Sequence, residues 1–269
     1  MEAIEILRSH ASFITQEQLE NLGPGRLLGE GGFGSVRQLV FEGSQTVVKE
    51  LLDSKALFPL LREARFMAEL NGAGGVPRPV ALCPNPPAMI QDYVGQLYEE
   101  YLMNCSVADV LNSLISISQR LEEIHAKGIL HNDLKMNNIT FSGTVSEPEF
   151  HIIDLGWACR SGQVAVECMK PMSEKKEIII RRKVCQEILG KDYTFESTAD
   201  DEEEDEDDDL TSEKVNIDPD DELVWMAPEL RQGGPVWPSG DVYSFGFLVE
   251  SVIELCPQTF LTEALTRLS

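Results

Sequence analysis

The stretch ILHNDLKMNNI, residues 129–139, places Asp133, Lys135 and Asn138 among apolar residues that are expected to be buried. A carboxylate beside a hydroxyl can accept its proton, a nearby lysine can hold a phosphate, and an amide oxygen can ligate Mg²⁺. A second carboxylate, Asp154, follows 21 residues later, at the end of a predicted strand and just before Gly156. Because Mg²⁺ is satisfied by a few protein oxygens plus phosphates and waters, the four residues indicate a phosphate-handling site.

Upstream, the sequence GEGGFGSV at 29–36 carries glycines at 29, 31 and 34 between two predicted strands. Glycines allow backbone N–H groups to approach phosphate oxygens closely, although such a cluster is more often a plain turn. Lys49 follows fifteen residues after Gly34, in VVKEL. Taken alone, it could be a strand-end lysine that extends its ammonium into water.

The rest of the chain reads as strands first and helices later. The helix predicted from Ser106 to Gly128 is the clearest, because its apolar residues recur every three or four positions and Ser106 is a good N-cap. The helix at 241–255 is apolar nearly all round and is therefore expected to be central. The other predicted elements are strands at 26–40, 44–52, 88–94 and 149–158 and a helix at 58–70.

Composition narrows the classes of protein. The chain has 269 residues, 42% of them hydrophobic, and a net charge of −24, which argues against binding to nucleic acid or to an anionic membrane. No apolar run approaches the ~18 residues of a membrane span, and no leader is visible, so a cytoplasmic location is expected. Six cysteines without a C-x-x-C pair indicate reduced thiols rather than a zinc site or a disulfide framework.

The charge is concentrated in one window. Residues 196–222 hold sixteen acidic residues against the single Lys214, a net −15, and include ten consecutive acids at 200–209. Such a block repels itself and cannot enter a core, so we expect a disordered insert. A solvated spacer and a specific partner-binding segment both remain open.

Taken in order, these motifs resemble those of the eukaryotic protein kinase family. GEGGFGSV resembles the glycine-rich loop, LREARFMAEL the helix αC, HNDLKMNN the catalytic loop, DLG the metal-binding triplet, and APE the end of the activation segment. Asp241 resembles the aspartate of helix αF. The resemblance implies an α+β, two-lobed fold, with a small antiparallel β-sheet N-lobe that carries αC and a mainly α-helical C-lobe that stops after αF.

It also implies domains and sites. The domain would cover 25–269, with an N-lobe and hinge at 25–94, a C-lobe from 95, a long activation segment at 157–224 and a flanking segment at 1–24. ATP and Mg²⁺ would be the cofactors, with Asn138 and Asp154 as metal ligands. The catalytic residues would be Lys49, Glu63, Asp133 and Lys135, with Glu63 as the partner of Lys49. Gln91 would be the gatekeeper, and His131 would be a packing residue that stacks with Met67 and Leu155. The nucleotide would be held by Leu28, Gly29, Glu30, Gly31, Gly34, Val36, Val47, Lys49, Asp92 and Val94.

Two departures from the family pattern bear on regulation. Asn132 stands where many of these kinases have an arginine, so activation by loop phosphorylation is not expected. Only 28 residues follow Asp241, so we expect the last helices of a kinase C-lobe, with the arginine that normally pairs with Glu229, to be absent from this sequence.

The resemblance implies a protein kinase specific for serine or threonine, of the tyrosine-kinase-like group because of VWMAPEL and DVYSFG. Its partner would be a protein substrate, with basic peptides favoured by the acidic insert. The alternatives are a non-catalytic, nucleotide-binding scaffold (pseudokinase) and a small-molecule phosphotransferase of related fold.

Overall fold

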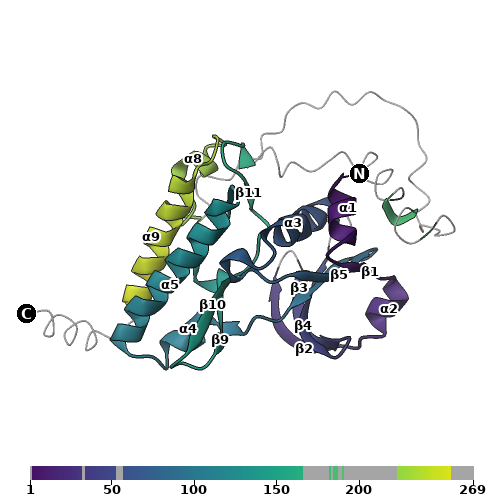
Figure 1. Ribbon diagram of the computed structural model, residues 1–269, viewed down its shortest axis with the longest axis horizontal. Helices are drawn as coiled ribbons and strands as arrows, with labels where there is room; N and C mark the ends of the chain where they lie inside the picture. Colours follow the sequence, from purple (N-terminus) through teal and green to yellow (C-terminus); the bar gives the residue numbers. More distant parts are fainter. Residues whose placement is uncertain are drawn as a thin grey trace, which may run out of the picture. The chain divides into compact units, whose positions relative to one another are not determined.

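A computed structural model describes residues 2–31, 34–52, 57–165, 182, 184–186, 190 and 223–255 (Figure 1). The chain divides into two compact units. The described part of the first unit is 2–31, 34–52, 57–64 and 79–92, with the short pieces between 182 and 190; that of the second is 65–78, 93–165 and 223–255. The acidic window 196–222 and most of the predicted long activation segment lie outside the described residues, as does 256–269.

The first unit is built on a six-stranded sheet of order β1-β5-β6-β4-β3-β2. Every pairing is antiparallel except the parallel pair of β1 and β5. The predicted strands at 26–40 and 44–52 are confirmed as the β2–β3 hairpin followed by β4, and the strand at 88–94 corresponds to β6. The strands are β1 Ser12–Phe13, β2 Arg26–Gly31, β3 Gly34–Phe41, β4 Ser44–Leu51, β5 Pro79–Pro84 and β6 Pro87–Asp92.

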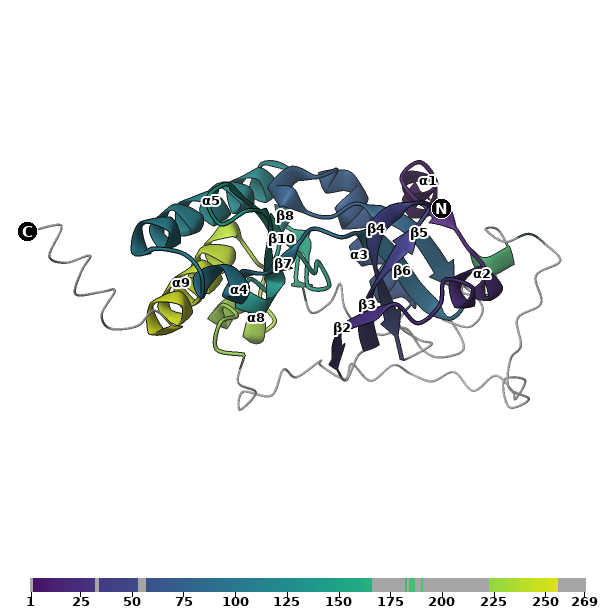
Figure 2. The ribbon, with the colours of Figure 1, turned by 90° about the horizontal axis from the view of Figure 1, so that it is seen from below.

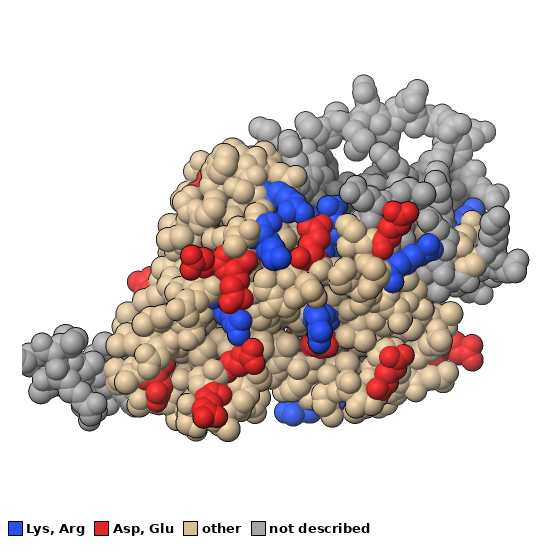
Figure 3. Space-filling model, viewed as in Figure 1, with Lys and Arg blue, Asp and Glu red and all other residues tan. Residues whose placement is uncertain are grey.

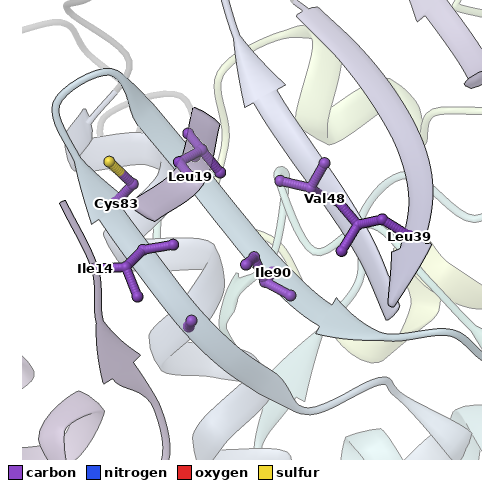
Figure 4. Close-up of a cluster of buried hydrophobic side chains, with 8 residues drawn as sticks. Ile14, Leu19, Leu39, Val48, Cys83 and Ile90 are labelled. Carbon is purple, nitrogen blue, oxygen red and sulfur yellow. The ribbon is translucent and has the colours of Figure 1, made fainter. Parts of the chain in front are cut away.

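The N-terminal segment packs onto this sheet. After α1 (Glu2–Arg8), β1 pairs with β5, and the backbone N–H of Ile14 donates to the carbonyl of Leu82 at 2.9 Å. Thr15 then begins α2 (Gln16–Glu20) with a capping box, which brings Leu19 onto the sheet. Ile14 and Leu19 are buried in one cluster with Leu39, Val48, Ala81, Cys83, Ala88 and Ile90 (Figure 4). Residues expected to flank the domain therefore contribute to the core of the first unit.

Helix α3 (Leu57–Leu70) confirms the helix predicted at 58–70. Its buried apolar residues recur at helical spacing, from Leu57 through Leu60 and Ala64 to Met67. The helix ends where Asn71 and Gly72 both adopt positive φ, a backbone conformation that favours asparagine and glycine. The same helix carries Glu63 on its buried face.

In its described part, the second unit combines helices with two small sheets, of order β10-β9-β7 and β11-β8. Ser106 caps α5 as predicted: its hydroxyl accepts the backbone N–H of Asp109, whose carboxylate accepts the backbone N–H of Ser106. α5 and α9 lie side by side in both ribbon views (Figures 1 and 2). The helices are α4 Tyr98–Leu102, α5 Val107–Ala126, α8 Pro228–Arg231 and α9 Pro238–Leu255, with 3-10 turns η2 Ala73–Gly75 and η3 Met136–Asn138. The strands are β7 Gln96–Leu97, β8 Ile129–Leu130, β9 Ile139–Gly143, β10 Pro148–Ile152 and β11 Cys159–Arg160.

The prediction that the helix at 241–255 would be central is wrong for the described residues. One stripe of α9 is buried, formed by Asp241, Ser244, Leu248 and Val252, whereas Val242 is 61% exposed. Ile253 and Leu255 are also about half exposed, at 47% and 51%. An apolar composition does not specify how many faces of a helix will be covered, and here the described chain covers one.

Three further properties concern the described residues. None of the helices there is long and apolar enough to cross a membrane. The described cysteines, 83, 105, 159 and 185, are free thiols in buried positions, and burial raises the pKa of Cys83 to about 11. On the face shown in Figure 3, acidic and basic side chains are intermixed, so this face carries no field of one sign.

Candidate active site

The first unit supplies an ion pair between strand β4 and helix α3. The Lys49 ammonium lies 3.0 and 2.9 Å from the two carboxylate oxygens of Glu63. Glu63 is only 4% exposed, so the ammonium compensates a charge that is largely removed from water. The pair predicted from the sequence is therefore present, and it fixes the position of the lysine head group.

The strand register places the predicted nucleotide contacts around this lysine. Gly29 on β2 lies opposite Val36 on β3, and Val36 lies opposite Lys49 on β4. Leu28 is 41% exposed and Val36 is half-buried, so both offer apolar surface to a ligand, whereas Val47 is buried at 7%. The sheet thus gathers Gly29, Val36 and Lys49 in one row across three neighbouring strands.

The glycines of the β2–β3 hairpin differ in whether packing requires a glycine at their position. A Cβ on Gly34 would overlap the backbone carbonyl of Glu50, so Gly34 is required by strand packing. A Cβ on Gly29 would meet nothing within 4 Å, so packing does not require glycine there. Glu30 and Gly31 complete β2, and the two residues at the tip, 32 and 33, lie outside the described residues.

The two predicted hinge residues fall in different units. Asp92 ends β6, where it lies opposite Thr46, and the predicted gatekeeper Gln91 lies opposite Val47. Val94 belongs to the second unit, where its carbonyl accepts the hydroxyl of Thr140 at 3.0 Å. The hydrogen bond from Thr140 fixes the carbonyl of Val94, and the role of Val94 and Asp92 in binding the nucleotide stays a prediction.

In the second unit, the carboxylate of Asp133 is surrounded by donors. Lys135 Nζ lies 3.2 Å from Oδ1 and 2.9 Å from Oδ2, and Asn138 Nδ2 donates to Oδ2 at 2.9 Å. Asn138 also donates to the backbone carbonyl of Asp133 at 2.7 Å. Asp133 is 5% exposed, so these contacts compensate a buried carboxylate and hold its plane in one orientation.

The loop that carries Asp133 is anchored on Asp241 of α9. Its carboxylate, fully buried, accepts the backbone N–H groups of His131 at 2.9 Å and Asn132 at 2.7 Å. His125 of α5 adds a third contact, with Nε2 at 2.7 Å from Asp241 Oδ2. A carboxylate with several N–H donors is a strong fixed acceptor, so one residue sets the path of the loop.

His131 is a structural residue, as expected. It is fully buried, its Nδ1 accepts the backbone N–H of Asp133 at 3.2 Å, and its Nε2 lies 3.0 Å from the carbonyl of Ile153. Because a carbonyl only accepts, Nε2 carries the proton and the ring is fully engaged. Met67 and Leu155, predicted to stack with it, are also buried in this unit, at 2% and 1%.

The predicted metal ligands lie at the open end of the β9–β10 hairpin. Ile139 pairs with Ile152, and the next residue, Ile153, donates its N–H to the carbonyl of Asn138 at 2.9 Å. Asp154 follows directly, at φ 64°, a conformation that turns the chain away from the strand. One carboxylate and one amide oxygen on adjacent segments fit a magnesium ion that takes its other ligands from phosphates and water. No three His, Cys, Asp or Glu residues converge in the part of the chain that the structure describes.

Asn132 fills the place of the missing arginine with hydrogen bonds of its own. Its Nδ2 donates to the carbonyl of Trp157 at 3.0 Å and contacts Cys159 Sγ at 3.1 Å. The residue has φ 63°, which asparagine tolerates better than most residues. The chain after Asp154 is therefore tied to the Asp133 loop by neutral groups.

A second tie joins this segment to α3. Arg160 on β11 forms an ion pair with Glu69, which also pairs with Arg65 at 2.8 Å. Arg160 donates as well to the carbonyl of Lys127, at 3.3 Å. The segment that follows Asp154 is thus held at both β11 and Asn132.

Two contributors were not recognised from the sequence. Trp225 donates its indole N–H to Asp133 Oδ1 at 2.8 Å, although 92 residues separate them, and His125 contacts Asp241 across 116. Sequence spacing contains no signal for such pairs, because only the folded chain brings them together. A tryptophan just before APE was the one available hint.

Comparison with known proteins agrees with these motifs. The model of the family described as "Protein kinase domain" matches residues 23–187. The serine/threonine/tyrosine-protein kinase HT1 of Arabidopsis thaliana is 24% identical over 178 residues, covering 63% of this chain and 32% of that protein. The serine/threonine-protein kinase PknD of Chlamydia pneumoniae is 26% identical over 254 residues, covering 86% of this chain and 24% of that protein. The chain thus spans a third or less of the length of these relatives.

Proposed function

The chain belongs to the protein kinase domain family, and from that premise we propose that it transfers the γ-phosphate of ATP to a serine or threonine hydroxyl of a protein. The observation that carries the proposal is the environment of Asp133: a buried carboxylate, oriented by Lys135 and Asn138, on a loop anchored by Asp241. A scaffold that only binds nucleotide has no need of an oriented base, so the pseudokinase alternative is not favoured.

Each residue has a part in the proposed reaction. Asp133 accepts the proton of the substrate hydroxyl as the oxygen attacks the γ-phosphorus, while the bond from that phosphorus to the β–γ bridging oxygen breaks and ADP leaves. The Lys135 ammonium faces the negative charge of the phosphate in transit. Lys49, held by Glu63, binds the phosphates of ATP and keeps them in line for attack. Asn138 and Asp154 would hold Mg²⁺, which supplies neutralisation of phosphate charge when bound.

The proposed substrate specificity rests on a few sequence motifs and on charge. Lys135, two residues after Asp133, resembles serine/threonine kinases, while VWMAPEL and DVYSFG resemble the tyrosine-kinase-like group. The net −15 of residues 196–222 favours basic peptide substrates, because opposite charges attract at low ionic strength. A cytoplasmic location is part of the proposal, and the buried free thiols support it.

The test is Mg²⁺-dependent transfer of labelled phosphate from ATP to a generic protein substrate. Asp133→Asn should abolish transfer and retain Mg·ATP binding, because the amide cannot accept the proton and the nucleotide contacts remain. Asp154→Asn should lose the Mg²⁺ dependence of nucleotide binding. Glu122→Gln, which changes an exposed carboxylate on α5, is the matched control and should behave as the parent. Equal turnover in Asp133→Asn and the parent would refute the assignment.

The charge of the acidic window gives a separate test of substrate choice. A basic peptide should be phosphorylated faster than a matched acidic one at 0.1 M salt, and the preference should fade toward 1 M, where the screening length shrinks from ~10 Å to ~3 Å. Deleting 196–222 should remove the preference. If the deletion variant keeps it undiminished, the window is a spacer.

A further inference from the structure

Trp225 makes two contacts with the residues around the proposed base. Its indole Nε1 donates to Asp133 Oδ1 at 2.8 Å, and its ring lies under the Lys135 ammonium, with Nζ 4.8 Å from the ring centroid. Trp225 is itself half-buried, packed against a cluster that includes Leu130, Met226 and Leu230. The indole is thus fixed by its apolar neighbours and directed at both polar groups.

The two oxygens of the Asp133 carboxylate differ in their hydrogen-bond donors. Each oxygen has two lone pairs. Oδ2 has two close donors, Lys135 and Asn138, both at 2.9 Å. Oδ1 has one close donor, Trp225 at 2.8 Å, and one longer contact, Lys135 at 3.2 Å. Oδ1 is therefore the oxygen on which a substrate hydroxyl can replace the weaker contact.

The ring of Trp225 also restrains the ammonium of Lys135. A cation over the face of an indole is attracted by the ring quadrupole. The Lys135 side chain is 34% exposed, so without the ring its ammonium would have considerable freedom to move in water. The indole face restricts that freedom in addition to the ion pair between Lys135 and Asp133.

We propose that Trp225 is a positioning residue for phosphate transfer: its indole N–H fixes Oδ1 of Asp133 and its ring face fixes Lys135, so that one side chain sets the base and the phosphate-facing lysine together. The inference rests on the proposed function. Trp225 itself touches neither substrate nor nucleotide in this scheme. Its position three residues before Pro228 also means that the conformation of the segment preceding α8 determines the geometry of the base.

The decisive test replaces the N–H alone. Benzothienylalanine at position 225 keeps the bicyclic ring and loses the donor, whereas 4-fluorotryptophan keeps both. The first should lower kcat about tenfold, ~1.4 kcal/mol, with little change in KM for ATP, and the second should retain parental kcat. Trp225→Phe should lose at least as much as benzothienylalanine. Trp237→Phe, which alters a tryptophan that is 53% exposed, is the control.

A second readout does not depend on activity. The chain has three tryptophans, so Trp157→Phe combined with Trp237→Phe leaves Trp225 as the sole emitter. In that background, Asp133→Asn and Lys135→Met should each shift its emission, and Glu122→Gln should not. An unchanged emission in both variants would overturn the proposed contact.

The outcomes separate the two proposals. A parent protein that transfers no phosphate would overturn the proposed function. A parent that does transfer phosphate, with kcat unchanged by benzothienylalanine, would overturn the role of Trp225 alone. A rise in kcat would overturn it as well, because the indole would then be obstructing the base rather than positioning it.

Discussion

The Lys49–Glu63 pair of the first unit joins one strand to one helix, whereas the Asp133 loop of the second unit is held from several elements. The carboxylate of Asp133 accepts hydrogen bonds from Lys135, Asn138 and Trp225, and the loop that carries it is anchored by Asp241. In the first unit one substitution can remove the ion pair that positions Lys49. In the second unit several residues position Asp133 together. We therefore expect substitutions in the first unit to affect turnover and those at Asp241 to affect folding.

Among the variants that test this contrast between the units, the largest effect is expected from Lys49→Met. The variant removes the ammonium that aligns the phosphates, and misalignment of reacting groups can cost ~100-fold in rate. Turnover should fall by about that factor, more than nucleotide affinity does, since alignment matters most in the transition state. Steady-state kinetics and nucleotide titration measure the two, with the exposed Lys127→Met as control. Unchanged turnover would show that the pair is not catalytic.

Next comes Asp241→Asn, which should destabilise the second unit by ~3 kcal/mol, because an amide cannot accept all three donors and its own N–H₂ faces one of them. All the tryptophans, 157, 225 and 237, belong to the second unit, so urea unfolding followed by tryptophan emission reports on it. Lys49→Met should shift that transition by less, although it removes the ammonium that compensates the buried charge of Glu63. Equal shifts in both variants would refute the contrast between the units.

Two substitutions of Asn132 distinguish the contribution of its hydrogen bonds to stability from that of its backbone conformation. Asn132→Gly loses the contacts to Trp157 and Cys159 but accepts φ 63°, and should cost ~1 kcal/mol. Asn132→Ala loses the same contacts and adds the strain of positive φ, for ~2 kcal/mol in total. The same urea experiment compares them. Identical midpoints for the two variants would exclude the strain contribution.

The smallest effect concerns pH. His151 is buried, with Nδ1 2.9 Å from the carbonyl of Gly75 and Nε2 2.8 Å from Ser142 Oγ. Desolvation lowers its pKa below the ordinary 6.5, although the hydrogen bond that it donates to the Gly75 carbonyl acts in the opposite direction. The unfolded chain then takes up a proton near pH 6.5 while the folded chain does not. Stability is lost as pH falls from 6.5 toward the folded pKa, by at most ~1.4 kcal/mol per pH unit.

His151→Gln should flatten that slope between pH 7.5 and 5.5 in thermal unfolding, and should leave the Lys49–Glu63 pair untouched. Of the charged neighbours, Glu149 raises the pKa of His151 and Arg120 lowers it. A slope as steep in the variant as in the parent would assign the pH dependence to other groups.

The sequence predicted the local elements and the residues with distinctive chemistry. The 3–4 spacing in α5, the cap at Ser106 and the Lys49–Glu63 pair are confirmed, because periodicity and capping are local and the motif order is specific. The residues that sequence missed, Trp225 and His125, act through partners about a hundred positions away. The exposure of α9 was misjudged because hydrophobicity reports a tendency to be buried and not the supply of covering surface.

The two-residue strand β1 has a consequence for how the protein associates with itself. It occupies the outer side of β5, whose row of backbone N–H and C=O groups would otherwise be an open sheet edge. A chain begun at residue 25, where the sequence resemblance places the domain, would lack β1 and the Leu19 cover, and would present that edge together with the apolar residues Ala81 and Ile90. We expect such a shortened protein to pair edge to edge and aggregate. By covering that edge, the residues before position 25 would prevent this pairing.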